Sequence, residues 1–204
     1  MEIDAIVAGA ARSLRSGENI AERGKLLAEA HMAALARFVT QLRVAEPSKE
    51  FPDFDPLDGG TGADILFLFE KPGPMTSAAG FGSGFISRDN DDPTAEATFG
   101  FMIQAGLPRR RTITWNVIPG WNGTRKVTAQ ELHDGVASLT ELLQLLPRLR
   151  TVVLVGKRAE RAKSLIEHLK LRVLVSAHPS PLVRASRPDV WRAIPILWAQ
   201  AGTS

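Results

Sequence analysis

The feature that most constrains this chain is the alternation of short apolar runs with amphipathic stretches after residue 63. Four runs are apolar enough to form strands buried on both faces: 64–70, 111–120, 150–156 and 171–177. Helical patterns alternate with them at 92–106, 128–147, 157–170 and 187–200. This alternation predicts a three-layer α/β/α domain with a central four-stranded parallel sheet.

Two of these helices carry recognisable start signals. Asp92 stands immediately before Pro93, which suits an N-cap followed by the first helical position, and Gly106 is expected to end that helix. Thr128 and Glu131 have the spacing of a capping box at the start of the next helix.

The part of the chain before the alternation has a different pattern. Residues 18–44 read as one amphipathic helix, and 45–63 are rich in Pro, Gly and Asp, as in a loop or linker. We therefore predict an N-terminal helical arm and linker over 1–62 and an α/β domain over 63–204.

The composition excludes several kinds of chemistry. Cysteine is absent, which rules out disulfides, thiolate nucleophiles and cysteine-ligated zinc or iron–sulfur clusters. The four histidines show no familiar metal spacing, so we expect no metal and no cofactor. No stretch is long and apolar enough to span a membrane, and acids precede the apolar residues of the N-terminus. We expect a cytoplasmic protein without a membrane partner.

Charge is unevenly placed along the chain. Residues 1–60 hold 7 Lys/Arg and 10 Asp/Glu, whereas residues 61–204 hold 18 and 12. The basic excess of +6 therefore belongs to the predicted α/β domain. It favours a polyanionic partner, although ordinary surface charge explains it equally well.

Ligands of such sheets bind at the carboxyl ends of the strands. Three strand ends carry polar groups between turn-forming residues, namely "EKPG" at 70–73, "NVIPG" at 116–120 and "HPSP" at 178–181. The amide of Asn116 has a donor and an acceptor and can read an amide-like edge such as that of a pyrimidine. The prolines around Ser180 would present its hydroxyl to a phosphate, next to His178. We expect these ends to form one site.

The ordered set "FEKPG", a phenylalanine in the following loop, "NVIPG" and then "HPSP" resembles the uracil-DNA glycosylase superfamily. The resemblance covers about residues 60–200. "HPSP" is the tetrapeptide of the main uracil-excising family, and "FEKPG" is similar to the Gly-Glu-Ala-Pro-Gly motif of the iron–sulfur branch. Because the chain lacks cysteine, it cannot hold the cluster of that branch.

The resemblance implies roles for the residues around the base. Phe85 would stack on a base flipped out of the DNA, and Asn116 would hydrogen-bond its Watson–Crick edge. His178 would stabilise the negative charge that develops on O2 of the departing uracil. The pocket would be lined by Lys71, Pro72 and Gly73.

The resemblance also implies contacts with the DNA strand. Ser180 and Pro181 would lie against a phosphate beside the lesion. Leu182, with Val183 or Arg184 near it, would wedge into the gap that the flipped nucleotide leaves in the stack.

Two positions depart from the superfamily pattern. Phe69 stands where the superfamily usually has Gly, and Lys71 stands where its most active family has the Asp that orients the attacking water. A protonated lysine cannot take over that role, so we interpret Lys71 as a solvated side chain that reaches DNA phosphate. Glu70, or an acidic residue between 89 and 92, is then expected to position the water.

The sequence thus predicts a monofunctional DNA repair glycosylase. It would flip uracil out of DNA, hydrolyse the N-glycosidic bond, release free uracil, leave an abasic site and act as a monomer. Two alternatives stay open. Lys71 allows a non-catalytic DNA-binding member of the same fold, and the modest net charge allows an α/β enzyme acting on a small nucleotide or nucleoside.

Overall fold

The computed structural model describes residues 9–167 and 169–203. Its centre is a sheet of four parallel strands: β2 (Ile65–Phe69), β4 (Thr112–Asn116), β5 (Thr151–Val155) and β6 (Arg172–Ser176). The strands lie in the order β4-β2-β5-β6, so β4 and β6 form its edges. The predicted four-stranded parallel sheet is confirmed.

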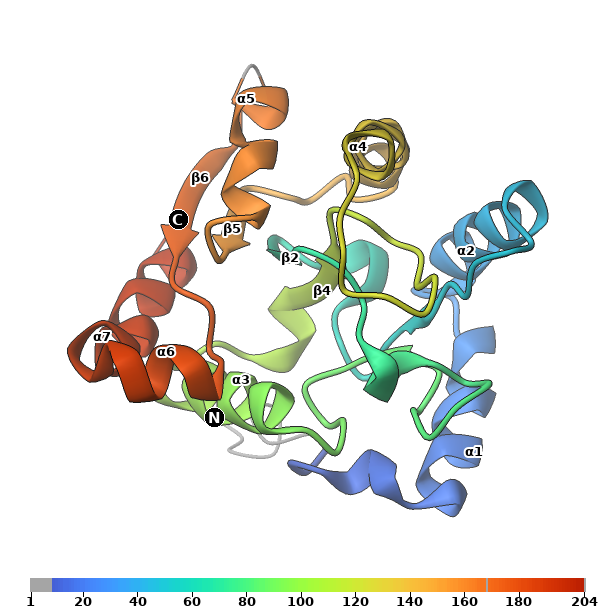
Figure 1. Ribbon diagram of the computed structural model, residues 1–204, viewed down its shortest axis with the longest axis horizontal. Coiled ribbons are helices and arrows are strands. Elements are labelled where there is room, and N and C mark those ends of the chain that lie inside the picture. Colours follow the sequence, from blue (N-terminus) through green and yellow to red (C-terminus); the bar gives the residue numbers. More distant parts are fainter. Residues whose placement is uncertain (1–8, 168, 204) are drawn as a thin grey trace.

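The remaining elements surround this sheet (Figure 1). The α-helices are α1 (Gly17–Lys25), α2 (Ala33–Ala45), α3 (Pro93–Gln104), α4 (Ala129–Gln144), α5 (Lys163–Ile166), α6 (Pro181–Ser186) and α7 (Pro188–Ala199). A second, two-stranded parallel sheet pairs β1 (Asp53–Phe54) with β3 (Phe85–Ile86). The short 3-10 helices are η2 (Ser13–Arg15), η3 (Leu26–Ala28), η4 (Gly60–Gly62), η5 (Pro74–Thr76), η6 (Arg109–Arg111), η7 (Ala159–Ala162) and η8 (Gln200–Gly202).

Helices cover both faces of the central sheet, with α2 and α4 on one side and α3 and α7 on the other (Figure 1). Successive residues of a strand point to opposite faces. In β2, Leu66 and Leu68 therefore belong to the core under α2 and α4, whereas Ile65 and Phe67 belong to the core under α3 and α7. This confirms the predicted three layers and explains why the strand is apolar at every position.

Both predicted helix starts are present. The side chain of Asp92 accepts hydrogen bonds from the N–H groups of Thr94 (2.8 Å) and Ala95 (3.0 Å) at the start of α3. At the start of α4, Thr128 and Glu131 form the predicted capping box, in which each side chain accepts from the other's N–H group. These bonds satisfy donors that a helix start otherwise leaves without partners.

The prediction of one helix over 18–44 is wrong. The structure has α1, η3 and α2 in its place, and the backbone is extended at Glu29 (ψ 146°). The break allows Met32 and Leu35, both fully buried, to enter the core, and the carbonyl of His31 accepts from the N–H of Thr61. Burial of two apolar side chains outweighs the continuity of one helix.

Three further details differ from the prediction. The second strand ends at Asn116 rather than at 120, and the helix expected over 157–170 is divided into η7 and α5. Residues 181–186, which no predicted helix covered, form α6, whose first position is a proline. The loop predicted for 45–63 contains the short strand β1.

The N-terminal segment contributes to the main core. Leu35 and Phe38 of α2 lie in the same cluster as Leu66, and the ring of Phe54 stacks on that of Trp115 with 3.8 Å between centroids. The boundary between 62 and 63 remains a prediction, but the described part of 1–62 packs against the α/β domain.

Candidate active site

The expected strand ends surround one cavity of about 500 Å³. It lies at the carboxyl ends of the strands and is closed on one side by the start of α3. The predicted site residues that line it are Glu70, Lys71, Pro72, Gly73, Asn116, His178, Ser180, Pro181 and Leu182. The structure therefore brings together the three motifs that the sequence singled out.

The pairing of β2 with β4 sets the inner end of this cavity. Phe69 is the direct partner of Asn116, and the N–H groups of Val117 and Ile118 continue the pairing by donating to the carbonyls of Phe69 and Glu70. The parallel register therefore holds the "FEKPG" and "NVIPG" turns side by side.

Asn116 is the polar side chain best placed to read a ligand. The residue is 4% exposed and lines the cavity. Among residues 9–167 and 169–203, no group hydrogen-bonds to its side-chain amide. Its amide atoms are also not among the described side-chain atoms that are fully buried without a partner, so they reach the cavity. The donor and the acceptor of the amide are therefore available to a bound molecule.

His178 is held against an aromatic wall. Its ring meets that of Phe69 edge to face, with 5.6 Å between centroids and planes at 89°. Gly156, at φ +92°, leaves room for it, because a Cβ there would lie 3.2 Å from that of His178. Burial, with the positive charge of Arg125, lowers the pKa of His178 to about 4. The imidazole is therefore neutral at pH 7 and keeps one N–H donor.

Lys71 is not the solvated lysine that we expected. Its side chain is 4% exposed, and Nζ donates to Glu131 Oε1 (2.6 Å), Asn122 Oδ1 (2.9 Å) and the carbonyl of Lys126 (2.9 Å). Burial alone would raise the pKa of Glu131, but hydrogen bonds from Lys71 and Thr128 lower it below its usual value. The ammonium group thus braces the start of α4 instead of reaching DNA phosphate.

Glu70, the acid expected to position water, lies at the cavity wall in an ion pair. Its carboxylate accepts from Nη1 of Arg158 at 3.2 and 3.3 Å. Glu70 retains partial exposure (23%), whereas Arg158 is largely exposed (61%). An exposed pair of this kind is weak, so Glu70 can exchange this partner for water.

The "HPSP" turn is followed by α6. The hydroxyl of Ser180 accepts from the N–H of Val183 and caps this helix, and Leu182 projects from it with 76% exposure at the edge of the cavity. Arg184 is not among the described residues that line the cavity; its guanidinium lies over the ring of Trp191, 5.2 Å from the centroid.

Phe85 is not brought to the cavity either. It is 4% exposed in β3, while its neighbour Ile86 lines the cavity. Because adjacent strand residues point to opposite sides, the two cannot share this role. The aromatic ring that the described residues do provide at the cavity is Phe69.

The sequence analysis missed several lining residues. They include Phe69, Arg88, Thr114, Arg125 and Arg158. The alternation of strand side chains could have identified Thr114. It precedes Asn116 by two positions on the same strand, and such residues point to the same face of the sheet.

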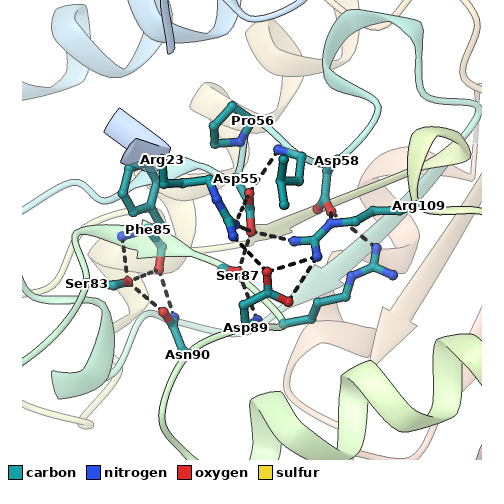
Figure 2. Close-up of polar contacts among 12 residues, drawn as sticks. Arg23, Asp55, Pro56, Asp58, Ser83, Phe85, Ser87, Asp89, Asn90 and Arg109 are labelled. Atoms are coloured by element: carbon teal, nitrogen blue, oxygen red, sulfur yellow. Dashed lines mark hydrogen bonds and ion pairs between the residues drawn. The ribbon is translucent and has the colours of Figure 1, made fainter. Parts of the chain in front are cut away.

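One wall of the cavity, formed by residues 86–90, rests on a buried charge cluster of Arg23, Arg88, Arg109, Asp55, Asp58 and Asp89. Figure 2 shows most of it. Arg109 donates to all three aspartates (2.6–2.9 Å), and Arg23 of α1 donates to Asp55 (2.6 Å) and Asp89 (3.0 Å). None of the six side chains is more than 7% exposed.

The electrostatics of this cluster are balanced. Burial tends to raise the pKa of Asp55, but Arg109 and Arg23 outweigh it and the pKa is lowered. At Asp58 the effect of burial is larger than that of the positive charges of Arg88 and Arg109, so the pKa is raised to about 6. Three arginines thus face three aspartates and fix the cavity wall through hydrogen bonds with defined geometry.

Other candidate sites are not found in the described part of the chain. Residues 9–167 and 169–203 contain no group of three His, Asp or Glu side chains able to hold a metal ion. Over the same residues, none of the helices has both the length and the apolar character needed to cross a bilayer.

A parallel α/β sheet with a cavity at its strand ends, a free buried amide and a neutral histidine defines a ligand-binding, enzyme-like site. A family model described as the uracil DNA glycosylase superfamily matches residues 57–197. The chain belongs to this superfamily. Membership implies that it binds DNA and is a glycosylase of DNA repair.

The chain is also similar to proteins of known structure. A protein from Methanosarcina acetivorans, studied by solution NMR and titled "putative Uracil DNA glycosylase", is 15% identical, with a TM-score of 0.48 over 69% of this chain and 91% of that chain. No curated protein matches the chain.

Proposed function

We propose that the protein is a monofunctional glycosylase that removes uracil from DNA and leaves an abasic site. The observation that carries this proposal is that the Asn116 amide, which pairs with no described group, lines the same cavity as a neutral His178. Uracil-containing DNA is the substrate, free uracil and abasic DNA are the products, and the protein acts as a monomer.

The amide of Asn116 suits the edge of uracil. That edge presents a carbonyl acceptor beside an N–H donor, and an amide group offers the complementary donor and acceptor. A uracil within the cavity would satisfy groups that are unpaired in the free protein, so binding gains hydrogen bonds without breaking protein contacts.

His178 suits the departing base. Cleavage of the N-glycosidic bond leaves positive charge on the sugar and negative charge on the base. A neutral imidazole can donate its N–H to the carbonyl oxygen where this negative charge develops, without adding a cation beside the sugar. The bond between the sugar carbon and the base nitrogen breaks, and its electron pair stays on the base. The oxygen of water then bonds to the sugar carbon; one of its protons remains on the new hydroxyl, and the other passes through solvent to the base.

Two further observations support hydrolysis by water. All three protons of the Lys71 ammonium are directed at protein acceptors, so it is a poor amine nucleophile. Of the acidic residues expected to position water, Glu70 and Asp92 line the cavity and keep part of their surface exposed. Asp92 is engaged as the N-cap of α3, whereas Glu70 is held only by the exposed Arg158. Leu182 would fill the gap left by the flipped nucleotide.

The test is single-turnover excision from an oligonucleotide that contains one uracil, with alkali to cleave abasic sites. His178→Ala should lose at least about tenfold in rate, because one donor to a developing anion contributes on the order of 2.7–4 kcal/mol. His133→Ala, an exposed histidine on α4, is the matched control. Rates of His178→Ala within threefold of the wild type would contradict the mechanism. DNA binding without base release by the wild type would favour a non-catalytic member.

A further inference from the structure

The ion pairs at the cavity differ in how firmly the protein holds them. The contact between Lys71 and Glu131 is 2.6 Å long, and the two side chains are 4% and 8% exposed. The pair of Glu70 and Arg158 has its shorter contact at 3.2 Å, and its side chains are 23% and 61% exposed. Both of its members line the cavity. An ion pair this exposed contributes little to stability, so a new partner can replace one member at small cost.

The pairing of β2 with β5 places the two residues next to each other. Leu68 is the partner of Leu154 in this pairing, so the strands end side by side, and Glu70 and Arg158 follow their ends. The chain between β5 and Arg158 turns at Gly156, which has a φ of +92°. The guanidinium therefore lies at the edge of the cavity, where a DNA strand must pass to deliver a flipped base.

The guanidinium of Arg158 uses only part of its capacity as a donor. Its Nη1 donates to both carboxylate oxygens of Glu70, at 3.2 and 3.3 Å. Over residues 9–167 and 169–203, its Nε and Nη2 have no hydrogen-bond partner. A guanidinium can bind a phosphate through two nitrogens at once, and such a contact is shorter and stronger than the present contact through one nitrogen. A phosphate of bound DNA is therefore an effective competitor for Arg158.

The carboxylate of Glu70 changes its chemical capacity when Arg158 leaves it. In the free protein its negative charge is balanced by the guanidinium. Without this partner, both oxygens can accept from a water molecule, and the negative charge stabilises the positive charge that develops on the sugar. Asp92, which also lines the cavity, accepts instead from the N–H groups of Thr94 and Ala95, and DNA phosphate does not compete with an acceptor.

We propose that Arg158 exchanges the carboxylate of Glu70 for a DNA phosphate when the substrate binds, and that this exchange frees Glu70 to orient the attacking water. The inference rests on the proposed glycosylase function and deepens it by linking DNA binding to hydrolysis. Arg158 is then a DNA contact that positions the water through Glu70. A free nucleoside has no phosphate, so it would leave the ion pair intact and would not be hydrolysed.

A double-mutant cycle on DNA affinity tests the exchange. The ligand is an oligonucleotide with one 2′-fluoro-2′-deoxyuridine, because fluorine next to the developing cation slows cleavage and allows Kd to be measured at equilibrium. Arg158→Gln should weaken binding and reduce the slope of log Kd against log salt concentration by about 1, as for one lost phosphate contact. Glu70→Gln should tighten binding about two- to fivefold, because it releases Arg158 from an exposed ion pair. This gain should disappear in the double variant.

The same segment of the chain offers matched controls. Glu160 and Arg161 are exposed and are not among the described residues that line the cavity. Arg161→Gln should change the salt slope by less than about half as much as Arg158→Gln. Any effect of Glu160→Gln on Kd should be the same with Arg158 present or replaced. Arg158→Lys, which keeps the charge, should restore the slope, and melting temperatures should verify that all variants fold.

Single-turnover excision of uracil completes the test. Arg158→Gln should mainly raise the enzyme concentration at half-maximal rate, whereas Glu70→Gln should lower the maximal rate at least about tenfold. The inference is overturned if the tightening by Glu70→Gln persists in the double variant, if Arg158→Gln leaves the salt slope unchanged, or if Glu70→Gln keeps a maximal rate within threefold of the wild type. Each of these results is compatible with uracil release by the wild type. Release of no base by the wild type overturns the proposed function as well.

Discussion

Acid should destabilise this protein through His178 before it denatures the fold generally. Burial and the charge of Arg125 lower the pKa of His178 to about 4 in the folded protein, whereas an unfolded histidine titrates near about 6.5. As the pH falls, the unfolded state binds the proton first. The stability linked to His178 is therefore fully present above about pH 6.5 and is lost between about pH 6.5 and 4.

The size of the effect follows from these two values. A difference of about 2.5 pKa units, at about 1.36 kcal/mol each, limits the effect to about 3 kcal/mol. At pH 4.5 most of the interval between the two pKa values has been passed. There we expect protonation linked to His178 to have lowered the free energy of unfolding by about 2–3 kcal/mol relative to neutral pH. Asp58 acts in the opposite direction, because burial raises its pKa to about 6. Its contribution to the free energy of unfolding is lost as the pH rises through that value.

The contribution of His178 is isolated by comparing variants. Urea unfolding at pH 7.5 and 4.5 should show that the wild type loses about 2–3 kcal/mol more than His178→Gln, which cannot titrate. The exposed His133 is the control, and His133→Gln should lose as much as the wild type. Equal losses in the wild type and His178→Gln, within about 0.5 kcal/mol, would refute a buried neutral imidazole.

Three other changes test the site and its support. Asn116→Asp should lower uracil excision by about 10- to 100-fold in single-turnover assays, because a carboxylate replaces the amide donor opposite a carbonyl; wild-type rates would mean that Asn116 does not read the base. Lys71→Ala should still release uracil, and borohydride should trap no covalent adduct with either protein, since the lysine is bonded to Glu131; an adduct lost in the variant would indicate an amine nucleophile. Arg23→Met should lower the free energy of unfolding by about 3–5 kcal/mol, because it leaves buried aspartates short of a partner, whereas the exposed Arg37→Met should change it little; equal effects in urea unfolding would contradict this account.

The sheet was predictable because its signals are local. An apolar run such as Ile65–Phe69 that is buried on both faces has few other interpretations, and the caps at Asp92 and Thr128 act within three residues. The break in the predicted helix over 18–44 was not predictable in this way. It depends on positions for Met32 and Leu35 in a core built mainly by later segments.

The same distinction applies to the site. The strand-end rule was sufficient to bring Asn116 and His178 to one cavity. The partner of Lys71 is Glu131, 60 residues away in sequence, and no local pattern indicates that pairing. The resemblance likewise suggested Phe85 for the cavity, but pairing between β1 and β3 buries this side chain and turns Ile86 to the cavity instead.

The buried charge cluster also sets an order for folding during synthesis. Arg23 and Asp89 are 66 residues apart, so at about 5–20 residues per second roughly 3–13 seconds separate their synthesis. A nascent chain that stops before Arg109 contains three aspartates of the cluster but two of its arginines. Removing these charges from water at that stage would leave one carboxylate without compensation. We therefore expect the segment around α1, although it is synthesised before η6, to stay hydrated until η6 has formed, and to complete the wall of the cavity as a late step.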